Sequence, residues 1–533
     1  MREWFKRWQK VIVWIIAGSF IAGIAWWSVA SYFSGRTPTG NSSIDQAVGY
    51  IKIKGSSILD VATWVLPSEL DSEYSNLLSR YGINMLDPLF QEPQQKASLL
   101  TQLLREKVII HYAKENKLTA TKKEIEAKLN EYKKQIEKDQ SLSQYFKQYY
   151  GSVDAYLTKV LKPAIEKSLI QEKVMNSVAK IDTDEMKKYF EENLDLLRQK
   201  YDKADVKLLS FSDENQAKTF MGKLLKLDFD SAASEMNLSV MNYPGLTRGI
   251  FDEKYENDIF SGATGTVIGP VPLGSSWYVL QVENATVIKD FNSFMLSDAY
   301  ETEKSSLQSQ KMQKWYDSYV KQNDIELVFA NEIYDYWKRI SETSTPTELE
   351  QIQENLKKRV FSQDGTVFPG APDTLKSAYI VLIEKIQDSL DSDNSESKQK
   401  WEKLEGERSL LVKNLYEQYP SSLEVVRRMY DVDKENLQVK YNYFSLLYSE
   451  IKPYLYPEYL QYLLQSIIEV QAGFSSIALD TKASTEMRAS SYYNLYDLSK
   501  SLEDATSARF YLEELRKIDP NYIDFEAALG ELK

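Results

Sequence analysis

Few residues in this chain could perform nucleophilic, acid–base or metal chemistry. Its 533 residues include no cysteine and a single histidine, His111. The lack of cysteine excludes disulfides, thiol catalysis and cysteine-ligated zinc or iron–sulfur sites. Because the chain has one histidine, a metal site built from several histidines is disfavoured. A serine–histidine pair could use only His111. The acidic residues are scattered along helical stretches, which favours solvated helix faces over paired catalytic carboxylates.

His111 itself lies within a helical pattern. Apolar and aromatic residues recur there at helical spacing, at Leu100, Leu103, Leu104, Val108 and Tyr112. We therefore predict that His111 is an ordinary packed or half-exposed helix residue. We also predict no metal and no cofactor, and the sequence has no Walker-type glycine loop that would bind ATP.

A glycine-rich stretch near the middle of the chain interrupts the helical pattern. The sequence "GTVIGPVPLGSSWYVLQV", residues 265–282, is typical of a tight turn, a short strand, a second turn and a closing strand. Upstream, "ADVKLLSF" is typical of a strand, and "ENQAKTFMGKLLK" and "FDSAASEM" are typical of helices. We predict a small α+β domain inserted into a mainly α chain.

The segments on both sides of this domain are predicted to be helical. Capping boxes, which satisfy backbone donors at a helix start, are expected at Thr121–Glu124 and Asp182–Glu185. A long helix is expected after residue 291, and helices continue to the end of the chain.

The last helices carry a weak repeat signal. A tetratricopeptide repeat places large, large, small and large side chains where this chain has Tyr492, Leu495, Ala508 and Leu512. Tyr496, however, stands where such a repeat needs a small residue. A degenerate helical repeat and a plain helical bundle both remain open.

The N-terminal segment predicts a membrane anchor. Residues 11–35 contain no charge, and a bilayer core needs about 20 apolar residues in a helix. The preceding flank "MREWFKRWQK" is basic, which keeps it cytoplasmic and sends the rest across the membrane. The alternative is a cleaved signal peptide with Ser28-Val29-Ala30 as its processing site. We predict a single-pass protein of the inner (cytoplasmic) membrane, with most of the chain in the periplasm or outside the cell.

Two parts of the chain resemble known families. "LLTQLLREKVIIHYAKENKLTATKKEIE" and the helical sequences that follow it resemble the N-terminal domain of SurA-type periplasmic chaperones. The α+β unit resembles a parvulin-type (PpiC) prolyl isomerase domain, by the spacing of Tyr255, Phe260 and Gly265 and by the turn "GPV" at residues 269–271. With an N-terminal anchor, the whole most resembles the PpiD branch. The resemblance covers residues 1–325.

The resemblance also implies which residues stand at the catalytic positions. The two family histidines fall at Val206 and Tyr278, and the Cys or Asp position falls near Ser239. The residue of the proline pocket falls at Phe251. We therefore predict a catalytically degenerate domain that has no catalytic residues.

A peptide-binding role is predicted for three aromatic residues of this domain, Phe251, Tyr255 and Phe260. The alternative is that they only form its core, and this is the expectation favoured for Phe260. For the other two, core and pocket remain open.

The predicted organisation has five segments: a basic flank and anchor (1–36), a SurA-like helical domain (37–200), a parvulin-like domain (201–290), a long helix returning to the helical domain (291–330), and a C-terminal helical domain (331–533). The leading hypothesis is a chaperone for unfolded or newly exported polypeptides. The alternatives are an active prolyl isomerase, and a helical adaptor whose C-terminal domain binds a protein partner of an envelope or secretion complex. The net charge of −13 argues against nucleic acid as a partner.

Overall fold

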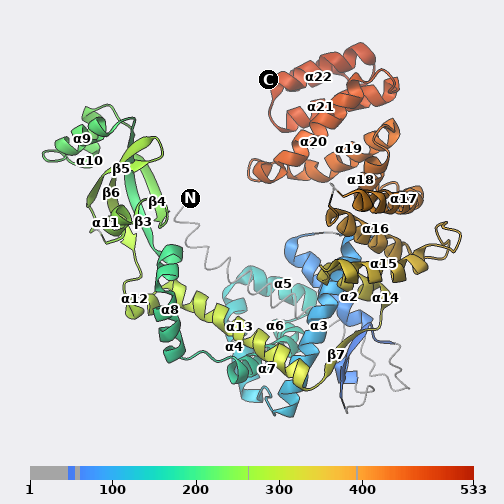
Figure 1. Ribbon diagram of the computed structural model, residues 1–533, viewed down its shortest axis with the longest axis horizontal. Helices are drawn as coiled ribbons and strands as arrows, with labels where there is room; N and C mark the ends of the chain where they lie inside the picture. Colours follow the sequence, from blue (N-terminus) through green and yellow to red (C-terminus); the bar gives the residue numbers. More distant parts are fainter. Residues whose placement is uncertain (1–45, 55–60, 84, 262, 392–393, 533) are drawn as a thin grey trace. The chain divides into compact units, whose positions relative to one another are not determined.

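The computed structural model describes residues 46–54, 61–83, 85–261, 263–391 and 394–532, and they are mainly helical (Figure 1). The prediction of a mainly α chain that contains a small sheet domain is confirmed. The described residues form two compact units. Unit 1 contains those of Met1–His111, Ala120–Lys167 and Ile325–Lys533, and unit 2 contains Tyr112–Thr119 and Ser168–Asp324.

Unit 1 combines the first helices of the chain with its last ones. Its elements are β1 (Gly49–Ile53), η2 (Val61–Thr63), β2 (Trp64–Val65), α2 (Pro67–Tyr81), α4 (Lys122–Lys138), α5 (Gln140–Tyr150), α6 (Val153–Tyr156), η3 (Leu157–Leu161), β7 (Ile325–Phe329), α14 (Glu332–Glu342), α15 (Pro346–Val360), α16 (Asp373–Asp388), α17 (Ser395–Gln418), α18 (Leu423–Val432), α19 (Leu437–Ile451), η4 (Lys452–Tyr454), α20 (Leu460–Leu479), α21 (Thr485–Ser501), α22 (Ala505–Ile518) and α23 (Phe525–Glu531). Two helices, α3 (Gln91–Glu115) and α7 (Lys162–Val178), contribute residues to both units.

Unit 2 contains the predicted α+β domain. Its elements are α8 (Thr183–Tyr201), β3 (Lys203–Phe211), α9 (Glu214–Lys223), α10 (Phe229–Glu235), β4 (Met241–Thr247), α11 (Glu253–Ser261), β5 (Val267–Leu273), β6 (Ser276–Thr286), α12 (Phe291–Met295) and α13 (Asp298–Gln322). The strands, the helices between them and the long helix after residue 291 are thus confirmed.

The predicted helix register and caps are confirmed as well. The α3 side chains of Leu100, Leu103, Leu104 and Val108 are buried. Both predicted capping boxes form, at the starts of α4 and α8. These features depend on residues within a few positions of one another, which is why local pattern predicts them.

A small antiparallel sheet joins distant parts of unit 1. Its strand order is β2-β1-β7, and Gly49 to Ile53 pair with Phe329 to Ile325. Gly49 is held close to α3, because a Cβ there would lie 3.2 Å from Leu100 Cδ1 and 2.9 Å from the Val328 carbonyl oxygen. The chain therefore returns, after the whole of unit 2, to a strand next to its own first described residues.

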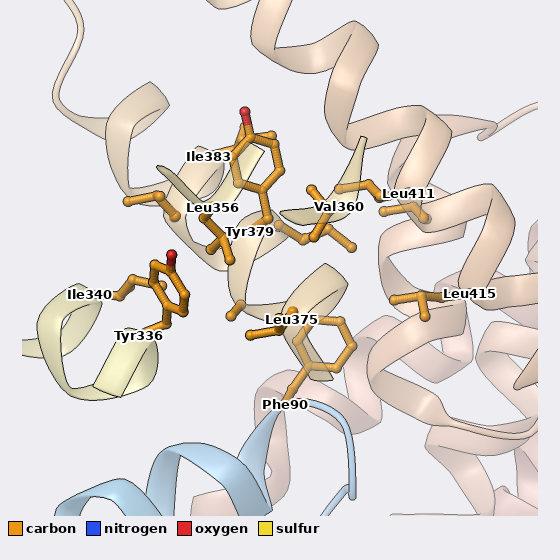
Figure 2. Close-up of a cluster of buried hydrophobic side chains, with 14 of the residues drawn as sticks. Phe90, Tyr336, Ile340, Leu356, Val360, Leu375, Tyr379, Ile383, Leu411 and Leu415 are labelled. Atoms are coloured by element: carbon orange, nitrogen blue, oxygen red, sulfur yellow. The ribbon is translucent and has the colours of Figure 1, made fainter. Parts of the chain in front are cut away.

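The early and late helices of unit 1 share one hydrophobic core. Phe90, just before α3, is 4% exposed and packs in a cluster with residues of α14 to α19 (Figure 2). The Arg428 guanidinium lies 4.1 Å from the centre of its ring. Ser377 Oγ donates to the Leu89 carbonyl at 2.5 Å, and Ser422 Oγ donates to Asp87 at 2.5 Å. The C-terminal helices are thus packed against the N-terminal ones. The predicted domain boundaries stay predictions.

A second core holds the last helices together. The four side chains of the repeat signal are buried in it, and so is Tyr496 at 5% exposure. They come from α21 and α22, which pack as a pair within this cluster. The tetratricopeptide-like character of this region stays a prediction.

The predicted location, a single-pass protein of the inner membrane, is wrong for the described part of the chain. None of the helices described there combines the length and the apolar character that a bilayer crossing requires. The segment 11–35, on which the prediction was based, lies outside the described residues.

Two buried carboxylates, those of Asp202 and Glu303, link segments of unit 2 that are far apart in the sequence. Asp202, which is fully buried, accepts from Arg248 Nε at 2.7 Å and from the Ile288 backbone N–H at 2.8 Å. It thereby joins the start of β3 to the loop after β4 and to the segment after β6. On the neighbouring helices, Glu303 of α13 is 5% exposed and accepts three bonds from α8. Their donors are Tyr189, Lys200 and Tyr201, at 2.7, 2.7 and 2.6 Å.

These bonds decide the charge of the Glu303 site. Burial alone would raise the pKa of Glu303, but the bonds from Lys200, Tyr201 and Tyr189 outweigh it and hold the pKa below its usual value. Burial and the bond to Glu303 raise the pKa of Tyr189 to about 12, so its hydroxyl remains a donor at neutral pH.

We predict that Phe90→Ala loosens both sides of the shared core in unit 1. Removing a buried phenylalanine typically costs about 3–5 kcal/mol. Amide hydrogen exchange should accelerate in α3 and in α16 together, because one ring supports both. Phe510→Ala is the matched control, since that ring is 55% exposed. Acceleration confined to α3 would show that the C-terminal helices do not depend on this contact.

We predict that Glu303→Gln destabilises unit 2 in a pH-dependent way. The glutamine side chain would present an N–H₂ donor to groups that are themselves donors, Tyr189, Lys200 and Tyr201. This mismatch should lower the free energy of unfolding by about 1–3 kcal/mol at pH 7. Since the folded-state pKa of Glu303 is lowered, its contribution is present above about pH 4.5 and is lost as the pH falls through that lower pKa.

The melting temperatures of the wild type and of Glu303→Gln should therefore converge once the pH falls below the lowered pKa of Glu303. Glu301→Gln is the control, because its side chain lies 74% exposed on the same helix. A constant difference between pH 7 and pH 3 would contradict the role of the charge.

Candidate functional site

The candidate site lies on one face of the four-stranded sheet in unit 2. The strand order is β4-β3-β6-β5, and all the pairs are antiparallel. α9 and α10 pack on one face, and α11 packs on the other (Figure 1). Along β3, Val206 and Leu208 point to the α11 face, whereas Leu209 and Phe211 point to the opposite one. This alternation decides which side chains can meet.

Val206 and Tyr278, the two positions predicted to replace the family histidines, lie on this face of the sheet. They are in different rows of it. Val206 is 1% exposed and lies opposite Val282, whereas Tyr278 is half-buried and lies opposite Ser210. Four residues of strand, roughly 13 Å, therefore separate Val206 from the row of Tyr278. Ser239 is exposed in the loop before β4 and is in neither row.

Ser210 of β3 lies directly opposite Tyr278 on this face, and Leu208 is the next β3 residue on the same face. It pairs with Leu280, which makes it the diagonal neighbour of Tyr278, at about 7–8 Å between Cα atoms. The register thus makes Ser210 the position facing Tyr278, with Leu208 diagonal to it and Val206 one row further away. No local pattern reveals this, because β3 and β6 are about 70 residues apart and no hairpin turn links them.

The three predicted peptide-binding aromatics separate into two kinds. Phe260 is 2% exposed, belongs to the domain core and lies 4.4 Å from the Arg248 guanidinium. It offers no surface to a ligand. Phe251 and Tyr255 are half-buried at the edge of the same core. The Phe251 ring meets the Tyr278 ring edge to face, with centroids 6.5 Å apart.

The edge strand β4 extends this surface in a way that the sequence analysis missed. Met241 pairs with Leu208, and Tyr243 pairs with Val206, so both side chains are on the α11 face. They are 54% and 45% exposed. We call the whole surface the aromatic face, and it consists of Leu208, Met241, Tyr243, Phe251, Tyr255 and Tyr278.

A buried carboxylate shapes the loop that carries Phe251. Glu256 of α11 is 8% exposed, and its Oε1 accepts from the backbone N–H groups of Gly249, Ile250 and Phe251 at 2.6, 2.9 and 3.1 Å. One oxygen thus gathers three consecutive amides. The loop is fixed by these bonds, and with it the place of the Phe251 ring beside Tyr278.

The six side chains of the aromatic face include hydroxyls but no histidine, acidic or basic group. Its only polar side-chain groups are the hydroxyls of three tyrosines, together with the exposed Ser210 opposite Tyr278. His111 is on α3, outside this sheet. Within the described residues, no group of three or more acidic or histidine side chains is arranged to hold a metal. The surface suits apolar and aromatic polypeptide segments.

Two family models match the chain. Residues 1–175 match the SurA-like N-terminal domain, and residues 181–293 match the PPIC-type PPIase domain. The predicted resemblance to SurA-type chaperones with a parvulin-type domain is confirmed by these matches. The second match includes the whole aromatic face.

Similar proteins are named as foldases. One named Foldase protein PrsA, from Clostridium acetobutylicum, is 25% identical over 239 residues, which cover 42% of this chain and 71% of that protein. Another of that name, from Caldanaerobacter subterraneus, is 22% identical over 255 residues, covering 46% and 72%. The crystal structure of the peptidylprolyl isomerase PrsA from Bacillus cereus is 13% identical and covers 57% of this chain and 98% of that one, with a TM-score of 0.21. A TM-score this low does not support an argument from the structure.

We predict that Glu256→Ala releases the loop Gly249 to Phe251. Three backbone donors would lose their acceptor, and each buried, unsatisfied group costs about 1–3 kcal/mol. Amide hydrogen exchange at these three residues should accelerate strongly, and Glu256→Gln, which keeps one oxygen, should fall between Ala and the wild type. Glu253→Ala is the control, because it is exposed in the first turn of the same helix. Equal amide exchange in the wild type and the three variants would mean that the loop keeps its conformation without the Glu256 carboxylate.

Proposed function

We propose that this protein is a chaperone for unfolded polypeptide segments, and that its PPIC-type domain binds such segments without isomerising prolyl bonds. The observation that carries the proposal is the aromatic face. Around Tyr278, the opposite residue Ser210 supplies a hydroxyl and the diagonal residue Leu208 an apolar side chain, and neither supplies an imidazole or a carboxylate. The SurA-like domain and the foldases among the similar proteins support the chaperone part.

The loss of catalysis follows from what these side chains can do. The barrier to prolyl isomerisation leaves the uncatalysed reaction at tens to hundreds of seconds. The side chains of Leu208 and Val206 neither donate nor accept a hydrogen bond. Tyr278 can form one, but no imidazole is available in this domain to orient it, since His111 is on α3.

The binding function needs only what remains. Phe251, Tyr255 and Tyr278 are half-buried, so each is held by the core while part of its ring is accessible. Rings fixed in this way lose little entropy on contact with a ligand and serve as binding anchors. Proline and aromatic side chains of an extended segment are the natural partners of such a surface.

We predict that the full-length protein gives no isomerisation of a proline tetrapeptide above the spontaneous rate. A protease-coupled assay at low temperature resolves this, with an active parvulin as the positive control. A rate that rises in proportion to the amount of protein would overturn the degenerate-site proposal. It would then assign the chemistry to hydroxyls such as those of Tyr278 and Ser210.

The same proposal predicts a specific pattern of binding loss. Phe251→Ala and Tyr255→Ala should each weaken a fluorescent proline-containing peptide by about thirtyfold, because losing an aromatic anchor costs about 2 kcal/mol. Their melting temperatures should stay near that of the wild type. Phe260→Ala is the matched control, since that ring is buried and its loss should cost about 3–5 kcal/mol of stability. If all three variants have equally lowered melting temperatures, Phe251 and Tyr255 serve only in the core of the domain and do not bind the peptide.

A further inference from the structure

The strand β7 has one side of its backbone without a strand partner. The small sheet of unit 1 has the order β2-β1-β7, so β7 pairs with β1 alone and forms an edge of the sheet (Figure 1). Among the described elements, only α14, which follows β7 directly in the chain, contacts it more than marginally besides β1. The family models end at residue 293, so neither match extends to this strand.

The hydrogen bonds around β1 indicate which backbone groups of β7 face the free side. In an antiparallel pair, residues that exchange hydrogen bonds alternate with residues that do not. Val48 accepts from the Ala330 N–H at 3.0 Å. In this register, the next bonded pair is Tyr50 with Val328. The Val328 carbonyl oxygen accordingly lies on the β1 side, 2.9 Å from where a Cβ of Gly49 would be. The residues whose N–H and C=O groups point away from β1 are therefore Ile325, Leu327 and Phe329.

The side chains of these three residues lie on the inner face of the sheet. Their β1 neighbour on this face, Ile51, is 2% exposed and pairs with Leu327. Ile325 is 7% exposed, whereas Leu327 and Phe329 are half-buried. The free edge of β7 therefore combines unpaired backbone groups with apolar side chains that a further strand would cover.

The charges on and beside β7 are paired. Its single charged residue, Glu326, accepts from Lys52 Nζ at 3.1 Å on the outer face. Lys338 of α14 lies over the Phe329 ring, 4.9 Å from its centre, and its Nζ is 3.7 Å from Glu342. β7 itself thus presents no isolated charge that an apolar segment would have to desolvate.

The other edge strands that the structure describes are protected against pairing. Natural proteins blunt free edges with proline, with very short strands or with a covering helix. In the sheet of unit 2, the edge strand β4 contains Pro244, and the edge strand β5 contains Pro270 and Pro272. β2, at the other edge of the sheet in unit 1, is two residues long, and both of its side chains are buried. Of the described edge strands, β7 alone is longer than two residues and has no proline.

We propose that β7 binds an extended segment of unfolded polypeptide as a further, antiparallel strand of this sheet. The inference rests on the proposed chaperone function and adds to it a site in unit 1 and a mode of recognition. The outward N–H and C=O groups of β7 match the main chain of any extended segment, so this recognition needs no particular sequence. A chaperone with varied clients requires such tolerance.

The register also predicts which segments fit best. Residues directly opposite each other in an antiparallel pair have their side chains on the same face. Client residues that bond to Leu327 and Phe329 would therefore point to the inner face, and their neighbours would point to the outer one. The site favours segments in which apolar residues recur at every second position.

The geometry favours an unfolded segment over a second folded copy. An unfolded polypeptide supplies an extended main chain anywhere along its length, whereas a folded copy would have to bring its own β7 to the same place. Two chains of net charge −13 also repel each other.

The test uses the full-length protein and a fluorescent nine-residue peptide of alternating valine and threonine. Leu327→Pro removes an outward N–H without removing a bond between β7 and β1, and it should weaken peptide binding at least tenfold. Leu327→Ala is the matched control, because it loses the same side chain and keeps the N–H, and it should weaken binding less than threefold. Circular dichroism melts should show that both variants are folded. Equal binding by the two variants would overturn the proposal.

A second measurement uses the wild type and so does not depend on the folding of a variant. Two isomers of the peptide carry N-methyl groups either on the valines or on the threonines. The residues that bond to β7 share its inner face, so the valines should supply the bonding N–H groups. The valine-methylated isomer should bind at least tenfold more weakly than the threonine-methylated one. Equal affinities would contradict strand addition.

Amide hydrogen exchange tests the other occupants. In the free protein, the amides of Leu327 and Phe329 should exchange faster than that of Val328, and the peptide should slow them. Slow exchange without peptide would mean that another segment of the chain or a second copy already pairs with β7. Sedimentation distinguishes these two cases, and either one would overturn the assignment to a client.

The results separate this inference from the proposed function. If Leu327→Pro binds the valine–threonine peptide like the wild type, while Phe251→Ala weakens the proline-containing peptide, only the β7 site fails. If the wild type binds neither peptide, the chaperone function fails, and the β7 proposal fails with it.

Discussion

The pairing of β3 with β6 is the constraint on which the chemistry of this protein depends. Two adjacent antiparallel strands show side chains to one face in fixed rows, so the register alone decides which residues can act together. Here it puts Ser210 opposite Tyr278 and Leu208 opposite Leu280. The row of Tyr278 therefore holds a phenol and a serine hydroxyl, and the next row on this face holds two leucines. A shift of one residue would turn every one of these side chains to the α9 and α10 side, where a separate core already fills the space. The register is therefore held by both cores at once.

Buried carboxylates maintain the geometry around that sheet. Asp202, Glu256 and Glu303 are each less than a tenth exposed, and each accepts two or three hydrogen bonds. Charged acceptors in such places stabilise only when their bonds are complete, and removing a donor leaves a costly buried charge. The three sites differ in what they hold. Asp202 joins the ends of the domain, Glu256 holds the loop of Phe251, and Glu303 joins α8 to α13. Buried polar groups thus fix the positions of the segments around the sheet, including the loop beside the aromatic face.

Local features of the fold could be predicted from the sequence, and distant contacts could not. The stripe of Leu100 to Val108, both capping boxes and the strands of the α+β domain follow from neighbours within a few residues. Phe90 packs among helices some 300 residues later in the chain. The local sequence pattern could not predict these partners, because it indicates only that an aromatic residue is buried and not what it packs against. For the site, resemblance led to Tyr278, Phe251 and Tyr255, which the structure places together. It led also to Val206, which lies on the same face but opposite Val282, and only the β3–β6 register shows this separation from Tyr278. Met241 and Tyr243 were missed because exposed residues on an edge strand give no apolar pattern.

Under the proposed function, the loss of catalytic groups and the retention of aromatic ones would be physically compatible. Catalysis requires contacts that are stronger in the transition state than in the ground state, whereas holding an unfolded segment requires ground-state contacts alone. A surface of half-buried rings such as Phe251 and Tyr255 supplies the second kind without the first. Under the proposed function, each ring would add a weak, sequence-tolerant contact, and release of a bound segment would need only one weak contact to open at a time.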